Sequence, residues 1–295
     1  MPFFKFIDYL TFEKNYSDHT VKSYRSDLSS FADFCKEEYR VIEIDRVNYS
    51  QIRSWIVMLS ESGISNRSIN RKISSLNTYF KFLIKIKEIQ VNPLAKHKAL
   101  KVAKKIQVPF SDKEMEQVIN LISEDDSFSG IRNRAIVELF YATGIRRSEL
   151  IALKHKDIDY SKKTIKVLGK RNKERILPLI NSVLETLQKY EREKREMGAK
   201  EKEYFFITNK GLKIYETFVY RVINSYFGMV STKVKKSPHM IRHSFATHLL
   251  NQGADLNALK ELLGHSSLAA TEVYTHNDIQ QLKNVYTNSH PRNKN

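Results

Sequence analysis

The segment that most constrains the fold runs from Ser237 to His276, because it carries the signals of three short helices in succession. Ser237 is typical of a helix N-cap and Pro238 of the first helical residue. Apolar residues then recur at every fourth position, as on the buried face of a helix. These residues are Ile241, Phe245 and Leu249.

Two further helices are marked in the same segment. One fits 255–263, with Gly264 placed to end it in a left-handed conformation. Ser266 or Ser267 can cap the next, which carries Tyr274. The segment therefore predicts a mainly helical domain whose functional side chains come from short helices and tight turns.

Polar side chains of the first helix lie apart from its apolar stripe. His239 and Arg242 are three residues apart and therefore share a face. They stand near the helix N-terminus, where free backbone N–H groups and the helix dipole favour an anion. The sequence alone leaves open whether this face meets His265 and Tyr274 in space.

The chain is strongly basic, with a net charge of +17 over 295 residues. Residues 1–110 hold 19 Lys and Arg against 11 Asp and Glu, and residues 111–295 hold 31 against 22. Because both halves are basic, a polyanion contacted by both is the natural partner, and nucleic acid is the commonest. A generally lysine-rich composition is the alternative interpretation.

The single cysteine, Cys35, excludes an intrachain disulfide, and its apolar neighbours indicate a packed thiol. The N-terminus lacks the basic and apolar regions of a signal peptide. No apolar run approaches the roughly 20 residues of a membrane span. We therefore expect a cytoplasmic protein with no membrane association.

Apolar periodicity predicts a four-helix N-terminal domain over residues 1–92. Its helices are expected at about 3–14, 17–39, 48–62 and 65–87. The fourth carries Arg67, Arg71 and Lys72, which either track phosphates or form a solvated face. Residues 93–110 contain prolines and a run of lysines that includes Lys104 and Lys105, and we expect a basic interdomain linker that can cross a DNA backbone.

The second domain, 111–295, is expected to be mainly α with a small three-stranded antiparallel sheet. Its tail begins at about 278 and has apolar residues before a polar end. The strands are expected at 156–160, 164–168 and 174–178, and the helices before the last segment at about 111–123, 129–142, 181–196 and 214–227, with a short one after Arg146.

Five short motifs follow one another along this domain: Thr143-Gly144-Ile145-Arg146, Gly169-Lys170-Arg171-Asn172-Lys173-Glu174-Arg175, His239-Met240-Ile241-Arg242-His243, Leu263-Gly264-His265 and Tyr274-Thr275-His276. In these motifs and their order the chain resembles the tyrosine recombinases, or phage integrase family, and within it the Xer-type site-specific recombinases. Ile241 stands where the family commonly has Leu, and Arg171 where it commonly has Gly. Neither difference removes a chemical group.

The resemblance implies a core-binding domain that clamps DNA, followed by a catalytic domain. It also implies cleavage of a phosphodiester by a tyrosine oxygen, which leaves a 3′-phosphotyrosyl link and a free 5′-hydroxyl. By resemblance the catalytic residues are Arg146, Lys170, His239, Arg242, His265 and Tyr274. Tyr274 is the nucleophile, and Arg146 and Arg242 stabilise the phosphate with His265 beside them. Lys170 protonates the leaving oxygen and His239 takes the tyrosine proton.

Several assignments keep an alternative. Lys173 competes with Lys170 for the role of general acid, whereas Arg147 is expected in phosphate contact or structure rather than in catalysis. Arg171 and Lys173 are expected to meet DNA from the hairpin. His243 follows His239 at metal-ligand spacing, but no HExxH glutamate or cysteine pair accompanies them, so we predict no metal. No P-loop or Gly-rich nucleotide motif indicates a cofactor.

The resemblance further implies double-stranded DNA with a specific recombination site as partner, and a homo- or hetero-tetramer with a related recombinase that passes through a Holliday junction. Resolution of chromosome or plasmid dimers is the expected role. The alternatives are a nicking-closing topoisomerase, a mobile-element integrase or transposase of the same family, and a DNA-binding regulator that has kept the fold but not the reaction.

Overall fold

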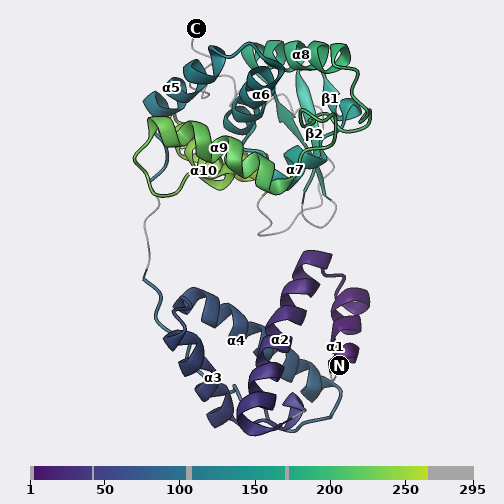
Figure 1. Cartoon of the computed structure of the whole chain (residues 1–295), viewed down its shortest axis with the longest axis vertical. Helices are drawn as coiled ribbons and strands as arrows, with labels where there is room; N and C mark the ends of the chain where they lie inside the picture. Colours follow the sequence, from purple (N-terminus) through teal and green to yellow (C-terminus); the bar gives the residue numbers. More distant parts are fainter. Residues whose placement is uncertain (1–2, 42, 104–107, 170–172, 265–295) are drawn as a thin grey trace. The chain divides into compact units, whose positions relative to one another are not determined.

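A computed structural model of the chain describes residues 3–41, 43–103, 108–169 and 173–264 (Figure 1). The chain divides into two compact units, 1–106 and 107–295. The described part is mainly helical and holds one three-stranded antiparallel sheet, which confirms the predicted fold class. Each unit is described below by itself.

The N-terminal unit contains the four expected helices: α1 (Phe4–Asp8), α2 (Asp18–Tyr39), α3 (Tyr49–Glu61) and α4 (Asn66–Lys85). One difference concerns the first, which continues after Asp8 as a π-helical segment, η1 (Tyr9–Glu13), instead of an unbroken α-helix. The helix starts follow local chemistry. Asn48 and Gln51 form a reciprocal capping box before α3, and the Ser65 hydroxyl accepts a hydrogen bond from the N–H of Ser68 before α4.

A buried carboxylate joins α2 to α4. The Asp27 side chain is 2% exposed and accepts hydrogen bonds from both Nη atoms of Arg71 and from Ser75 Oγ, the last at 2.8 Å. The ammonium of Lys72 lies 3.4 Å from the same carboxylate. Two of the predicted DNA contacts therefore also compensate a buried charge, and this ion cluster fixes how α2 and α4 pack.

Replacing Arg71 with Ala should lower the free energy of unfolding of the N-terminal unit by about 2 kcal/mol, because the buried Asp27 keeps only Lys72 and Ser75 as partners. Urea unfolding followed by the fluorescence of Trp55 measures this, since Trp55 is the only tryptophan and is fully buried in this unit. The matched control is Arg67→Ala, an exposed arginine one turn earlier on α4. Equal midpoints for the two variants would contradict a stabilising role for the cluster.

Part of the predicted linker packs against the N-terminal unit. Leu94 is 4% exposed and belongs to its core. Farther along, Asn70 of α4 both donates to the carbonyl of Leu100 and accepts from its N–H, at 2.8 and 2.9 Å. Asn66 donates to the carbonyl of Lys101 at 2.9 Å. These bonds hold the backbone at 100–101 along α4.

The C-terminal unit is built around α6 (Phe128–Thr143), which is buried along almost its whole length (Figure 1). It packs against α5 (Asp112–Ser123), α8 (Asn181–Glu196) and α10 (Pro238–Asn251). Because α6 is covered by these helices, its C-terminal end lies inside the unit. The remaining elements are α7 (Arg147–Ala152), α9 (Glu216–Val230), α11 (Leu256–Leu263), the 3-10 helix η3 (His155–Asp157), β1 (Ile158–Asp159), β2 (Thr164–Leu168) and β3 (Glu174–Pro178).

The sheet has the order β1-β2-β3 with antiparallel neighbours. Val167 pairs with Arg175 and Leu168 with Glu174, and the N–H of Gly169 donates to the carbonyl of Lys173 at 2.7 Å. This bond closes the base of the β2–β3 hairpin. The side chain of Arg175 points to the buried face of β3, where a hydrophobic residue is the usual occupant.

The beginning of the unit is fastened to α10. The N–H of Phe110 donates to the hydroxyl of Ser244 at 2.8 Å, and Ser244 is fully buried. His248, one turn farther along, contacts Tyr141 of α6 and Asp112 of α5 through Nδ1, each at 2.9 Å. Within the described residues, no helix is long and apolar enough to span a membrane.

Candidate active site: an arginine cluster

Arg242 of α10 bridges the ends of two other helices. Its guanidinium donates to the carbonyl of Gly144, after α6, and to the carbonyl of Leu263, at the end of α11. The residue is 8% exposed. Gly144 has a φ of +58°, and a Cβ built there would lie 2.5 Å from the ring of Phe245, so the turn requires glycine. We had placed Arg242 off the core of α10; it is instead buried.

Arg146 lies beside this bridge, at the N-terminus of α7. Its Nη2 donates to the carbonyl of Gly264 at 2.7 Å, and its Nη1 donates to Oε1 of Glu149 at 2.8 Å. Its backbone N–H donates to the other oxygen of Glu149, also at 2.8 Å. The side chain of Arg146 is 29% exposed, so it is the arginine through which the cluster meets solvent.

Arg175 completes the cluster from β3. Its two Nη atoms donate to the two oxygens of Glu149 at 2.7 and 2.8 Å, and its Nε donates to the carbonyl of Leu262 at 2.9 Å. Such a two-pronged pairing is the strongest geometry for a guanidinium and a carboxylate. The cluster thus comprises three arginines and one glutamate, with a formal charge of +2.

The electrostatics of the cluster are visible in two pKa shifts. Burial, followed by the charges of Arg146 and Arg175, lowers the pKa of Arg242 to about 10. Burial alone would raise the pKa of Glu149, but the hydrogen bonds and charge of Arg175, together with Arg146, hold it below its ordinary value. An excess of positive charge is therefore held where few water molecules screen it, an arrangement that attracts an anion.

Two glycines approach the cluster closely. A Cβ built on Gly169 would lie 3.3 Å from Nη1 of Arg175 and 3.7 Å from Nη1 of Arg146. A Cβ built on Gly264, where φ is +63°, would lie 3.3 and 3.4 Å from the same two atoms. The hairpin base and the end of α11 therefore reach the arginines from two directions.

Comparison with known proteins decides the family. The model of the phage integrase family matches residues 110–281, and that of the phage integrase N-terminal SAM-like domain matches residues 4–87. The chain belongs to the phage integrase family. It is 38% identical over 291 residues to a tyrosine recombinase XerC of Anoxybacillus flavithermus, covering 97% of this chain and 96% of that one. It is 37% identical over 289 residues to a tyrosine recombinase XerC of Staphylococcus aureus, covering 98% and 96%. The family and Xer-type resemblance inferred from the motifs is therefore confirmed.

Solved structures of the family share the fold. An XerA recombinase is 27% identical with a TM-score of 0.50, and the match covers 97% of each chain. The Tn1549 transposon integrase in complex with transposon right end DNA is 22% identical with a TM-score of 0.72, covering 95% of this chain and 98% of that one. The XerH site-specific recombinase bound to a palindromic difH substrate is 20% identical with a TM-score of 0.71, covering 95% and 79%. At such identities the last two show the fold alone.

The structure brings together only part of the residue set predicted for this family. Arg146 and Arg242 lie in one cluster, joined through Gly264, Leu263 and Gly144. His239 is exposed in the first turn of α10, three residues before Arg242. The predicted cap of that helix, Ser237, stands at the N-cap position, but its side chain makes no capping hydrogen bond. The remaining predicted catalytic residues, Lys170, His265 and Tyr274, lie outside the described residues.

The predicted DNA contacts of the family fold are distributed over both units. Arg147 pairs with Glu216 of α9 at 2.6 Å, and Lys173 is exposed at the hairpin base. Arg67 is exposed on α4, whereas Arg71 and Lys72 pair with Asp27. Lys104, Lys105 and Arg171 lie outside the described residues. No group of three or more His, Cys, Asp or Glu that could hold a metal occurs in the part of the chain that the structure describes.

Sequence reasoning missed Glu149 and Arg175. Glu149 stands three residues after Arg146, the spacing of a capping box, and that spacing was the available signal. Arg175 alternates with Leu177 on the buried side of β3, and a charged residue at such a position requires a partner. Neither signal indicates that Glu149 and Arg175 are partners of each other.

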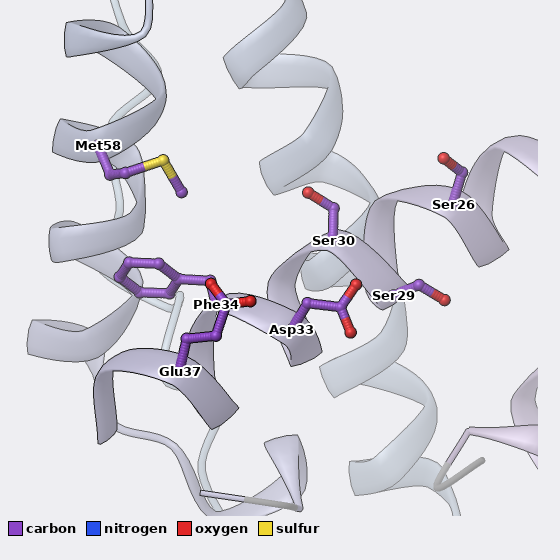
Figure 2. Close-up of a pocket in the computed structure, with 7 residues that line it drawn as sticks. All are labelled: Ser26, Ser29, Ser30, Asp33, Phe34, Glu37 and Met58. Atoms are coloured by element: carbon purple, nitrogen blue, oxygen red, sulfur yellow. The ribbon is translucent and has the colours of Figure 1, made fainter. Parts of the chain in front are cut away.

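A pocket of about 400 Å³ lies in the N-terminal unit between α2 and α3 (Figure 2). Figure 2 shows Asp33 and Glu37 on α2, beside three serines and Phe34, with Met58 of α3 opposite. Its lining carries two carboxylates and no lysine or arginine. The pocket is therefore unsuited to a phosphate, and the arginine cluster remains the candidate site.

Proposed function

We propose that the arginine cluster binds the scissile phosphate of duplex DNA and that Tyr274 attacks it, forming a 3′-phosphotyrosyl link with release of a 5′-hydroxyl. The observation that carries the proposal is the cluster of Arg146, Arg175, Arg242 and Glu149, which has a formal charge of +2 and is buried except at Arg146. The protein is a Xer-type tyrosine recombinase by its relatives. Permanently charged guanidinium groups suit a transition state that gathers negative charge on non-bridging oxygens.

The covalent chain supports the other catalytic assignments. Gly169 and Gly264 both approach Arg146. Lys170 and His265 directly follow these two glycines in the sequence, and consecutive Cα atoms are about 3.8 Å apart. Lys170 then acts as general acid on the leaving 5′ oxygen, since a lysine carries a movable proton that an arginine lacks. His265 donates to the phosphate beside the arginines. His239, in the first turn of α10, takes the proton of Tyr274.

Phosphate contacts outside the active site are proposed on both units. In the catalytic unit they are Arg147, Arg171 and Lys173, and in the linker Lys104 and Lys105. Of the three cations predicted on α4 of the N-terminal unit, Arg67 is the most available, because Arg71 and Lys72 share Asp27. Binding by so many cations should be steeply salt dependent.

The assembly and biological role follow from the relatives. We propose a homo- or hetero-tetramer with a related recombinase on two DNA sites, acting in the cytoplasm on chromosome or plasmid dimers. The relatives named XerC are 37–38% identical over nearly the whole chain, whereas the transposon integrase supports only a shared fold. Dimer resolution is therefore favoured over a mobile-element role.

A nicked suicide duplex tests the reaction. The duplex should carry the sequence most enriched among DNA fragments crosslinked to the protein in cells, with a nick that lets the cleaved strand diffuse away. The wild-type protein should become covalently attached to one strand and migrate as a protein–DNA adduct in denaturing gels. Binding of the same duplex without any adduct would instead favour a DNA-binding regulator.

A further inference from the structure

We propose that Arg175 is a positioning residue, which engages the carboxylate of Glu149 so that Arg146 keeps its charge for the bound anion. The inference rests on the proposed function in taking that anion to be the scissile phosphate. Arg175 does not itself contact DNA in this proposal. Its role is to set the net charge of the cluster.

The contacts of Glu149 show how the carboxylate is shared. Oε1 accepts from Nη1 of Arg175 at 2.7 Å and from Nη1 of Arg146 at 2.8 Å. Oε2 accepts from Nη2 of Arg175 and from the backbone N–H of Arg146, both at 2.8 Å. Arg175 therefore donates to both carboxylate oxygens, whereas the guanidinium of Arg146 donates to one oxygen that it shares with Arg175.

The exposure of the two arginines separates their roles. The side chain of Arg175 is 6% exposed, and its Nε and both Nη atoms already donate to protein acceptors. The side chain of Arg146 is 29% exposed, and no described partner takes its Nε. Arg146 can receive an anion, and Arg175 is positioned only to act on Arg146 through Glu149.

Without Arg175, the balance of the site changes. Glu149 would be left with Arg146 as its only described cationic hydrogen-bond partner. The negative charge of its carboxylate would then offset the positive charge of the Arg146 guanidinium, which should bind phosphate. The formal charge of the cluster would fall from +2 to +1. Buried charges interact strongly, so this single step should weaken anion binding far more than the loss of a surface arginine.

The cluster charge predicts an order of sulfate affinities among variants. Sodium sulfate is titrated at constant ionic strength, and its binding is followed by the shift in melting temperature. Arg175→Gln should bind sulfate at least about tenfold more weakly than the wild type, and Glu149→Gln at least as tightly. The double variant Arg175→Gln/Glu149→Gln restores a charge of +2 and should regain wild-type affinity. Arg221→Gln, an exposed arginine of α9, controls for general effects of sulfate on stability.

Two results would overturn the inference. One is a double variant that binds sulfate no better than Arg175→Gln, since a purely structural role would not be relieved by removing a second side chain. The other is Arg175→Lys behaving like Arg175→Gln, because lysine keeps the charge while losing the two-pronged pairing and the bond to Leu262. Arg175→Lys also keeps the test decisive if Arg175→Gln does not fold.

Covalent adducts on the suicide duplex, measured with the same variants, separate this inference from the proposed function. Sulfate affinities in the predicted order without any wild-type adduct would support the charge balance and reject the recombinase reaction. A wild-type adduct with sulfate affinities unrelated to the cluster charge would support the recombinase reaction and reject the charge balance. In Arg175→Gln the cleavage rate should also rise as the pH falls, because protonation of Glu149 removes the competing charge.

Discussion

Tyr274→Phe should abolish the covalent protein–DNA adduct while leaving the affinity for the duplex close to that of the wild type. The phenol oxygen is the atom that bonds to phosphorus in the proposed reaction. A water molecule that attacked in its place would cut the strand without attaching it to the protein. Loss of an enzyme nucleophile can cost about 10⁶-fold in rate. The measurement is adduct formation on the nicked suicide duplex, with Kd from gel shifts on the intact duplex.

Tyr220→Phe is the matched control, because Tyr220 is an exposed tyrosine of α9 and the same hydroxyl is removed. It should form adducts at the wild-type rate. An adduct that persists in Tyr274→Phe would assign the nucleophile to another residue. Loss of binding together with loss of adduct would show that Tyr274 contributes to DNA affinity as well as to chemistry.

Local chemistry made most helix boundaries predictable. Ser111 and Glu114 form a capping box at the start of α5, and Gly144 and Gly264 end α6 and α11 with positive φ. These signals depend on side chains within a few residues of each other, so they can be recognised in the sequence without knowledge of the fold. The π-helical segment after Asp8 had no such signal.

Contacts between distant segments were not predictable in the same way. The Arg242 guanidinium was expected apart from the apolar stripe of its helix, and it is nevertheless buried because the ends of α6 and α11 come to α10. Periodicity identifies the apolar stripe of a helix, and it does not show which polar neighbours are covered by other elements. The pairing of Asp27 with Arg71, 44 residues later, depends equally on how α2 meets α4.

The arginine cluster shows why the candidate site and the fold cannot be separated. Carbonyls at the C-terminal ends of α6 and α11 lack partners within their helices, and they accept bonds from Arg242, Arg146 and Arg175. The same bonds fix the positions of the guanidinium groups. Substitutions of these arginines should therefore change stability and activity together, and each activity measurement needs a melting curve beside it.

Lys170→Ala should slow cleavage of an ordinary suicide duplex by about 10²–10⁴-fold, the range for loss of a general acid. The same variant should cleave a duplex with a 5′-bridging phosphorothiolate at nearly the wild-type rate. A thiolate leaves without taking a proton, so the substrate no longer needs the acid. Rescue by sulfur therefore distinguishes proton donation from phosphate binding or folding, because neither of those is relieved by a better leaving group.

Lys173→Ala is both the control and the rival assignment. Its backbone carbonyl accepts the N–H of Gly169 and closes the hairpin base, a bond that the substitution keeps. Its side chain is exposed, so Lys173→Ala should weaken DNA binding modestly and cleave both duplexes at similar rates. If the sulfur substrate rescues Lys173→Ala and not Lys170→Ala, the general acid is Lys173. If it rescues neither variant, the proton reaches the leaving oxygen from a group other than these hairpin lysines.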